Sequence, residues 1–520
     1  MNLLLLLIFI PALAGLAAFA IGPDRPRRVL LLATAAMHAF ITGTVAWHRP
    51  PPLGNGWLAL DDLGLLFLAI TSLLFLAAAL YAVPYLAHEK PGVHADRTEP
   101  FLFVNAPEAT FTGCLLFFLA TMTLVCLTQR LGLLWVGLEA TTLTSAPLIY
   151  YHRHHRSLEA LWKYLVICSV GIALALLGNF CLSAATVQTP GGAAAPLALY
   201  GLIGQGHAGA LQPAWLKAAF IFILVGYGTK AGLAPLHAWM PDTYSEAPAL
   251  VALLSGALLN CALLGILRAF QVCLAADLGA FARDLLVLFG LFSMAVAAVF
   301  LLRQRNYPRM LAYSSIEHMG IITLGVGVGG IATAGALFHA LNHSLAKAML
   351  FLVAGNILTL YQTKEIAAVR GLGRTAPVTA ALWLAGFFAI TGAPPFATFL
   401  SELQILLGAL SLDRWGVAAL YLGLLAAIFI GMLDVFPRMV WPAPVHSGGA
   451  THPATATTDF EPGADAALAG PTLLTPEPRR YPWRLLPPCL LAAALLVLGL
   501  AMPPALAQFF ERCSTLLTGN

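Results

Sequence analysis

Charged residues are scarce in this sequence. Of its 520 residues, 10% are Asp, Glu, Lys or Arg and 60% are hydrophobic, and the mean hydropathy is +0.84. Soluble domains carry about 25% charged residues, so this composition excludes a water-soluble fold. The formal net charge is +4, and the basic residues lie at the ends of apolar runs. This distribution excludes a nucleic-acid-binding surface.

Motifs that hold cofactors are also missing. The eight cysteines are scattered and none are spaced as CxxC, which argues against an iron–sulfur cluster, a zinc site or a disulfide framework. The sequence contains neither a P-loop nor a GxSxG elbow. We therefore expect no catalytic centre, no metal and no cofactor in this chain. If it serves a redox enzyme, the cofactors lie in other subunits.

Long apolar runs dominate the sequence instead. Each has about 20 residues, the length that a helix needs to cross about 30 Å of hydrocarbon. We expect an all-α, polytopic membrane protein with about fourteen transmembrane helices. The runs occupy residues 2–22, 28–48, 59–87, 111–128, 130–150, 159–184, 217–238, 247–270, 279–303, 308–329, 331–361, 374–411, 414–441 and 484–508.

The basic residues indicate an orientation in the membrane. Lys and Arg gather in the odd-numbered loops, for example at Arg25, Arg153 and Arg303, and are fewer in the even-numbered loops. The positive-inside rule then places the odd loops in the cytoplasm. We expect an inner-membrane protein with both termini on the periplasmic side. Residues 442–483 are rich in Pro, Ala, Thr and Gly, which predicts a flexible cytoplasmic linker.

Several ionisable residues lie inside the apolar runs. A charge at the centre of a membrane helix costs about 2.5–3.5 kcal/mol on insertion scales, so such residues mark functional sites by default. Together they predict a path for protons or a small cation. The candidates for proton transfer are Glu139, Lys163, Lys230, His339, His343, Lys347 and Glu402.

Three of these candidates share one helical stripe. His339, His343 and Lys347 follow each other at intervals of four residues, which places them about 6 Å apart on one face. Neutral imidazole both accepts and donates a proton, and burial makes a lysine easier to deprotonate. The stripe therefore favours a proton relay. The alternative is that the histidines are hydrogen-bonded into the packing and the lysine extends its ammonium toward the interface.

Two candidates border predicted helix breaks. Pro235 follows Lys230, and Pro394 and Pro395 precede Glu402. Broken helices in corresponding positions of two halves indicate an ion site, because freed backbone groups bind charge and water.

The two halves, residues 111–270 and 279–441, would each hold one base and one acid. We expect Lys230 to pair with Glu139, and Lys347 with Glu402. The alternative is that Glu139 and Glu402 form fixed structural salt bridges. His237, Glu317 and His318 are candidates for proton access; the alternative for Glu317 and His318, which we expect nearer a cytoplasmic helix end, is an interfacial cap.

At this point the sequence resembles a known family. The segments KAGLAPLHAWMPDTYSEAP, ALLSGALLNCALLGILR, RNYPRMLAYSSIEHMGIITLGVG and ALFHALNHSLAKAMLFLVAGNI resemble the antiporter-like subunits of respiratory complex I and of multi-subunit sodium/proton antiporters. The resemblance covers about residues 110–440. YSSIEHMG together with WKYLVICSVGIALAL is most similar to the hydrogenase-4 component F branch of group 4 hydrogenases and formate hydrogenlyase.

The resemblance implies fourteen helices in two inverted five-helix repeats, each containing a broken helix. It assigns the conducting roles to Glu139, Lys230, His343, Lys347 and Glu402, and Lys163 matches a lysine of some relatives. The implied parts are N-terminal helices (1–110), a first repeat (111–270), a second repeat (279–441), the linker (442–483) and a last helix (484–520).

One position departs from the family pattern. Where several relatives carry a lysine or histidine on the eighth helix, this sequence has Asn260, which cannot exchange a proton near neutral pH. Its amide can still bond a water, so the link between the halves would be water-mediated.

The resemblance implies a proton-translocating subunit of an energy-converting complex without a catalytic centre of its own. The implied partners are other membrane subunits, the lipid bilayer and a soluble redox or carbon-hydrating arm. The alternatives are a sodium/proton antiporter module, a membrane subunit of an inorganic-carbon uptake complex, and a non-conducting scaffold.

Overall fold

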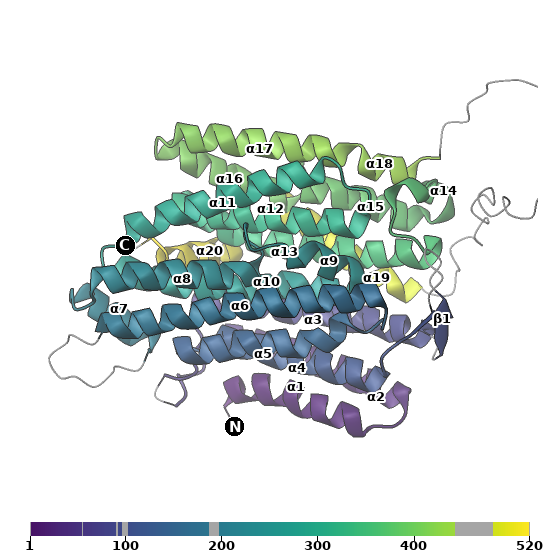
Figure 1. The fold of residues 1–520 in the computed structure, drawn as a ribbon, viewed down its shortest axis with the longest axis horizontal. Helices are drawn as coiled ribbons and strands as arrows, with labels where there is room; N and C mark the ends of the chain where they lie inside the picture. Colours follow the sequence, from purple (N-terminus) through teal and green to yellow (C-terminus); the bar gives the residue numbers. More distant parts are fainter. Residues whose placement is uncertain are drawn as a thin grey trace, which may run out of the picture.

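The long apolar runs form an extended bundle of roughly parallel helices (Figure 1). The computed structural model describes residues 2–54, 56–89, 92–95, 102–186, 197–442 and 482–518. Within these residues, twelve helices are long and apolar enough to cross a membrane, and a bent pair at the C-terminus raises the number to thirteen. The all-α membrane fold is therefore confirmed, whereas the predicted number of about fourteen spans is not.

The N-terminal part consists of three long helices. Asp61 caps the third helix by accepting a hydrogen bond of 2.9 Å from the Gly64 amide, which matches the placement of an acidic residue before an apolar run. The helices are α1 (Leu3–Ala20), α2 (Asp24–Trp47) and α3 (Asp62–His88).

Two sets of five helical segments follow, and the fourth segment of the second set consists of two shorter apolar helices. The first set contains α4 (Glu108–Leu127), α5 (Leu131–Ile149), α6 (His155–Thr186), α8 (Pro213–Ala231) with α9 (Trp239–Glu246), and α10 (Ala249–Ala275). The second contains α11 (Gly279–Leu301), α12 (Tyr307–Val328), α13 (Ile331–Tyr361), α15 (Pro377–Ile390) with α16 (Ala397–Ser411), and α17 (Trp415–Leu433).

In both sets the fourth segment is broken. Helix α8 ends at Gly232 in a left-handed conformation, and α15 ends just before Gly392, which also has a positive φ angle. Both breaks also contain a cis X-Pro peptide bond, at Pro235 and Pro395. The breaks therefore lie beside Lys230 and Glu402, where the proline pattern predicts them.

Several elements differ from the sequence expectation. Between the predicted runs 159–184 and 217–238 lies an additional short helix, α7 (Leu199–His207). The last predicted span is two helices, α19 (Leu486–Leu500) and α20 (Pro504–Thr515), bent by 84° because consecutive prolines interrupt the helix. A short hairpin pairs β1 (Val93–Ala95) with β2 (Leu102–Val104). Most of the predicted linker 442–483 lies outside the described residues.

The remaining elements are short. They are η1 (Ile366–Ala368), α14 (Leu372–Thr375), α18 (Val435–Val440) and η3 (Pro482–Arg484).

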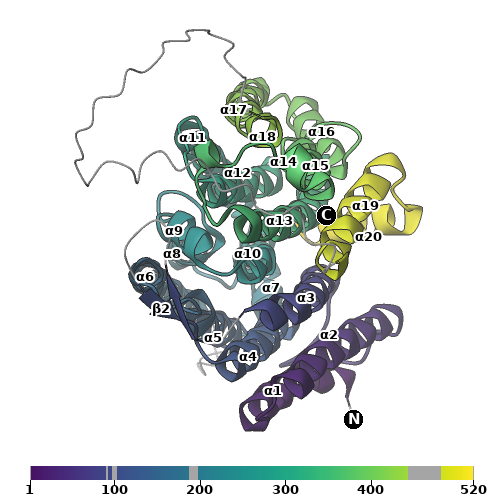
Figure 2. The ribbon, with the colours of Figure 1, turned by 90° about the vertical axis from the view of Figure 1, so that its right-hand side faces the viewer.

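Helices α10 and α13 form the centre of the bundle (Figure 2). They pack against each other, and α10 is buried along its whole apolar window. A helix that is apolar on all sides is stable only when neighbours surround it. The close approach of α10 and α13 depends on Gly256, because a Cβ at this position would lie 3.3 Å from the Ser344 Cα of α13. The two halves of the chain therefore meet along α10 and α13.

A buried ion pair fixes one end of α10. Arg268 is buried and forms a two-bond pair with the Asp61 carboxylate at the start of α3. Burial by itself would raise the pKa of Asp61, but the charge and hydrogen bonds of Arg268 more than offset it, so the pKa lies below its ordinary value. This pair stabilises the fold at every pH above the ordinary carboxylate pKa of about 3.9, and its contribution is lost as the pH falls through the lowered value.

We expect Asp61→Ala to lower the stability of the folded chain by about 3–5 kcal/mol, because it leaves the Arg268 guanidinium buried without a counter-ion. Thermal unfolding in detergent near neutral pH measures the loss. Asp434→Ala, which removes an exposed pair with Arg438, is the matched control. Equal melting temperatures for the two variants would contradict the expectation.

Candidate functional site

Lys230 lies at the end of α8 and is completely buried. Its ammonium donates hydrogen bonds to the Leu138 carbonyl and, at 2.5 Å, to the Thr142 hydroxyl, both on α5. A buried ammonium needs such acceptors, because an uncompensated charge in a low-dielectric interior is costly. The lysine is thus held by neutral oxygens of the neighbouring helix.

Glu139, the predicted partner of Lys230, is half-buried on α5 between these two acceptors. The two charges interact electrostatically, but no ion pair joins them among the residues that the structure describes. One oxygen of the Glu139 carboxylate is buried and without a hydrogen-bond partner. The structure therefore brings Lys230 and Glu139 close together without a salt bridge.

Lys347 repeats this arrangement in the second half. It is completely buried on α13, and its ammonium donates to the Leu311 carbonyl at 2.6 Å and to the Ser314 hydroxyl, both on α12. The carboxylate that interacts with its charge is Glu317, one turn along α12. The expected partner Glu402 forms no ion pair with Lys347 in the described part of the chain, because α12 and not α16 provides the acceptors.

Three histidines form a stack between α12 and α13. The ring of His318 lies 5.0 Å from the ring of His339 and 5.1 Å from that of His343. His318 Nδ1 and His339 Nε2 share a hydrogen bond of 2.8 Å, and His339 Nδ1 contacts the Ser401 hydroxyl at 2.9 Å. Both ring nitrogens of His343 are buried without a partner.

This stack changes the interpretation of Glu317 and His318. Both are buried near the middle of α12, so the alternative of an interfacial cap near a helix end is wrong. Their position about ten residues into the predicted run 308–329 was the signal in the sequence that pointed to the centre of the membrane.

Glu402 lies on α16 directly over the second break. A Cβ at Gly392 would overlap its carboxylate, so the close approach depends on glycine. One ring nitrogen of His318, one of His339 and one carboxylate oxygen of Glu402 lie within 4.8 Å of one another. The 2.8 Å contact between the two imidazoles is too short for both to bind one ion without rearrangement, since ligands of a tetrahedral site lie further apart. One water suffices to bridge the remaining gaps.

Asn260 connects the two halves. It is buried on α10, and its amide donates a hydrogen bond of 2.8 Å to the Ser344 hydroxyl, next to His343 on α13. Its carbonyl oxygen is buried without a partner, which leaves an acceptor for a water. The predicted link is therefore polar, although no group in it titrates near neutral pH.

Lys163 is not where the sequence predicts it. Its side chain is 43% exposed near the start of α6, and its ammonium lies 2.7 Å from both Glu159 and Asp242. The expectation of a buried lysine is wrong, because the side chain lies at the surface of this chain and pairs with Asp242 of α9. His237 is half-buried in the first break, where its ring lies 6.4 Å from the rings of Phe300 and Tyr313.

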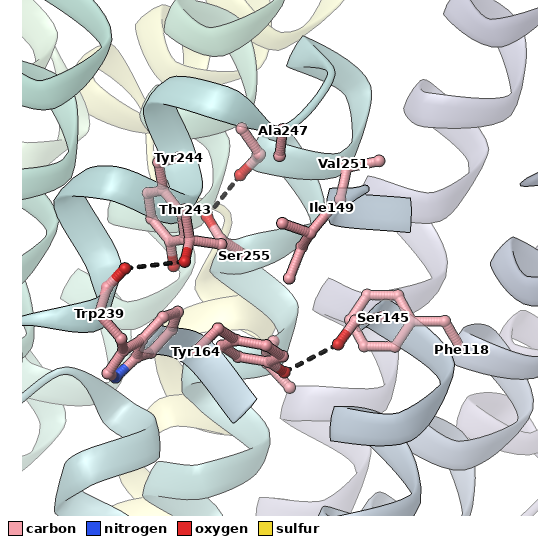
Figure 3. Close-up of a pocket in the computed structure, with 12 residues that line it drawn as sticks. Phe118, Ser145, Ile149, Tyr164, Trp239, Thr243, Tyr244, Ala247, Val251 and Ser255 are labelled. Carbon is pink, nitrogen blue, oxygen red and sulfur yellow. Dashed lines mark hydrogen bonds between the residues drawn. The ribbon is translucent and has the colours of Figure 1, made fainter. Parts of the chain in front are cut away.

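Sequence reasoning missed the hydroxyl groups near Lys230. Tyr164 and Ser145 share a hydrogen bond of 2.8 Å beside a cavity of about 20 Å³ between α5, α6, α9 and α10 (Figure 3). Ser145 lies one turn after Thr142, which binds Lys230. Ser and Thr are common in membrane helices, so the sequence offered no signal that these bind a lysine.

Comparison with known proteins agrees with this architecture. The model of the transmembrane family "NADH:quinone oxidoreductase/Mrp antiporter, TM" matches residues 128–429. A hydrogenase-4 component F homolog of Methylacidiphilum infernorum is 37% identical over 393 residues, which cover 75% of this chain and 80% of the relative. NADH-quinone oxidoreductase subunit N of Desulforudis audaxviator is 28% identical over 454 residues, which cover 82% of this chain and 85% of the relative.

Among solved structures, a chain of the membrane-bound sulfane sulfur reductase, an archaeal respiratory membrane complex, superposes with a TM-score of 0.81 at 21% identity, covering 100% of this chain and 98% of that one. At this identity the likeness concerns the fold alone. The family match runs from the start of α5 into α17 and contains all the residues of the candidate site. This protein therefore belongs to the NADH:quinone oxidoreductase/Mrp antiporter transmembrane family.

Proposed function

We propose that this chain is a proton-translocating membrane subunit of a larger energy-converting complex. The observation that carries the proposal is the series of buried polar groups across the bundle: Lys230, Asn260 with Ser344, the three stacked histidines, Lys347 with Glu317, and Glu402. Groups of this kind are retained in a membrane interior where they serve transport. The family membership supports the same function.

Protons would move between these groups directly and through water. Lys230 and Lys347 are held by carbonyl and hydroxyl oxygens, which also accept hydrogen bonds from a neutral amine. Each lysine could therefore lose its proton without losing its position. A charge that crosses 100 mV exchanges about 2.3 kcal/mol, an amount comparable to a change of one to two pH units in the pKa of one group.

The partners in this proposal are other membrane subunits, as in the multi-subunit complexes whose subunits this chain resembles. A soluble redox or carbon-hydrating arm would supply the driving reaction. We further propose a cytoplasmic-membrane location with both termini on the periplasmic side. In support, the ends of the chain lie toward the end of the bundle opposite the β1–β2 hairpin (Figure 1).

We expect Lys347→Gln to lower proton flux at least about tenfold, equal to about 1.4 kcal/mol, because glutamine can keep the bond to the Leu311 carbonyl but cannot carry a proton. Proteoliposomes that contain the whole complex, energised by a potassium diffusion potential and filled with a pH-sensitive dye, measure the flux. Asp434→Asn, on the exposed surface, is the control. Flux at the control level in Lys347→Gln would refute the proposal.

Asn260→Leu should also reduce flux by about tenfold, since it removes the amide that bonds to Ser344 while it keeps a similar side-chain volume. Asn260→His, which restores a titratable group, should retain or raise the flux. The same dye assay compares the two variants. If leucine and histidine give equal flux, protons do not pass this position.

Sodium separates this function from the antiporter alternative. A proton-translocating subunit should show the same flux in sodium-free and sodium-containing vesicles, whereas a sodium/proton antiporter module should require sodium. If the flux disappears without sodium, the chain exchanges sodium for protons and the proposed function is wrong.

A further inference from the structure

The first helix break carries a charged segment that contacts both halves of the chain. Helix α9 follows the break and packs against α6 of the first half and α12 of the second. Figure 2 shows it beside α8, between α6 and α12. Two acidic residues, Asp242 and Glu246, lie on this short helix.

Asp242 binds one cation from each half. Its Oδ2 atom lies 2.7 Å from the Lys163 ammonium on α6, and its Oδ1 atom pairs with the Arg309 guanidinium on α12. The carboxylate is 20% exposed, less than either of its partners. One oxygen of the Asp242 carboxylate therefore pairs with the first half of the chain and the other oxygen with the second half.

Further bonds attach the same segment to the second half. Glu246 pairs with Lys364 at 2.9 Å, in the segment that follows α13. The Asn306 amide, at the start of α12, donates a hydrogen bond of 3.4 Å to the Ser245 hydroxyl. Within the break, the Ala234 amide donates a bond of 3.0 Å to the Ser293 hydroxyl of α11.

The segment is also attached to the functional residues of each half. The Trp239 indole, at the start of α9, donates a hydrogen bond of 2.9 Å to the Thr229 carbonyl, next to Lys230. Arg309 precedes Glu317 by eight residues on α12, which is about two turns and about 12 Å. A rigid helix transmits a displacement over this distance.

Among the residues that the structure describes, the second break has no comparable charged connection to the other half. The amide of Asn342, in the same half, bonds to the Ala397 carbonyl at 3.0 Å, and α19 packs over the break, where a Cβ at Gly499 would meet the Pro395 backbone. In the described residues, no ion pair joins this break to the first half. The charged connection between the halves is therefore one-sided and centred on Asp242.

We propose that Asp242 is a positioning residue that couples the two halves. A shift of the broken segment, caused by a change in the charge of Lys230, moves Arg309 and with it the part of α12 that carries Glu317 and His318. This inference rests on the proposed function, because it assigns the connection between two stations of the same path.

The test measures the response of the second half to a change in the first. A hydrophobic carbodiimide modifies protonated carboxyl groups inside membranes, and mass spectrometry of the whole complex follows its reaction with Glu317. We expect Lys230→Gln to change the rate of this modification by about twofold or more, the size expected for residues coupled in one network. Asp242→Asn should abolish that response.

Three variants exclude a merely structural effect. Asp242→Glu, which keeps the charge, should retain the response. The reversed pair, Asp242→Arg with Arg309→Asp, should restore more of it than either single change. Asp434→Asn is the matched control, because it neutralises an aspartate in an exposed ion pair away from α9, and it should leave the response unchanged.

Two results would overturn the inference: a Glu317 response to Lys230→Gln that persists in Asp242→Asn, or the absence of that response in the otherwise unaltered chain. If Asp242→Asn does not assemble, Arg309→Gln breaks the same connection from the other side and takes its place. The proposed function and the coupling can be refuted separately. Unchanged proton flux in Lys230→Gln would refute the proposed function. If Lys230→Gln abolishes flux but the change in Glu317 modification does not depend on Asp242, only the coupling is refuted.

Discussion

The whole site depends on the cost of placing an ammonium group inside an apolar bundle. Lys230 and Lys347 are both completely buried, and in each half a carbonyl and a hydroxyl of the neighbouring helix accept their hydrogen bonds. A direct carboxylate partner would hold the lysine in its charged form. Neutral oxygens solvate both forms, while Glu139 and Glu317 act from a short distance. This arrangement leaves the protonation state of each lysine open to change.

The two halves share this design but differ around it. The second half continues from Lys347 into a stack of three histidines and the Glu402 carboxylate. In the first half, Asp242 and Glu246 beyond the break beside Lys230 form ion pairs with residues of α6, α12 and the segment after α13. Helix α10 of the first half carries Asn260, whose amide donates a hydrogen bond to Ser344 of the second half. In the proposed function, protons pass this position through water. In the proposed function, the first half responds to the charge of Lys230 and the second half relays protons.

Local sequence rules predicted the parts of this structure that depend on neighbouring residues. The prolines located both breaks, and the four-residue spacing placed His339, His343 and Lys347 on one stripe. Long-range partners were not predictable: Arg268 pairs with Asp61 across 207 residues, and Glu317 replaced Glu402 beside Lys347. The exposure of Lys163 was also missed, because apolar residues surround it in sequence on a lipid-length helix. Such features arise from how helices pack.

The decisive measurement is the charge state of the Lys347 side chain, because a proton relay requires this group to gain and lose its proton. Solid-state nitrogen NMR of the complex, with lysines labelled at Nζ and Lys347→Gln used for assignment, distinguishes ammonium from neutral amine. We expect the Lys347 signal to change between the two forms as pH is varied across the range in which the complex transports protons. A signal that stays that of an ammonium throughout this range would contradict this expectation.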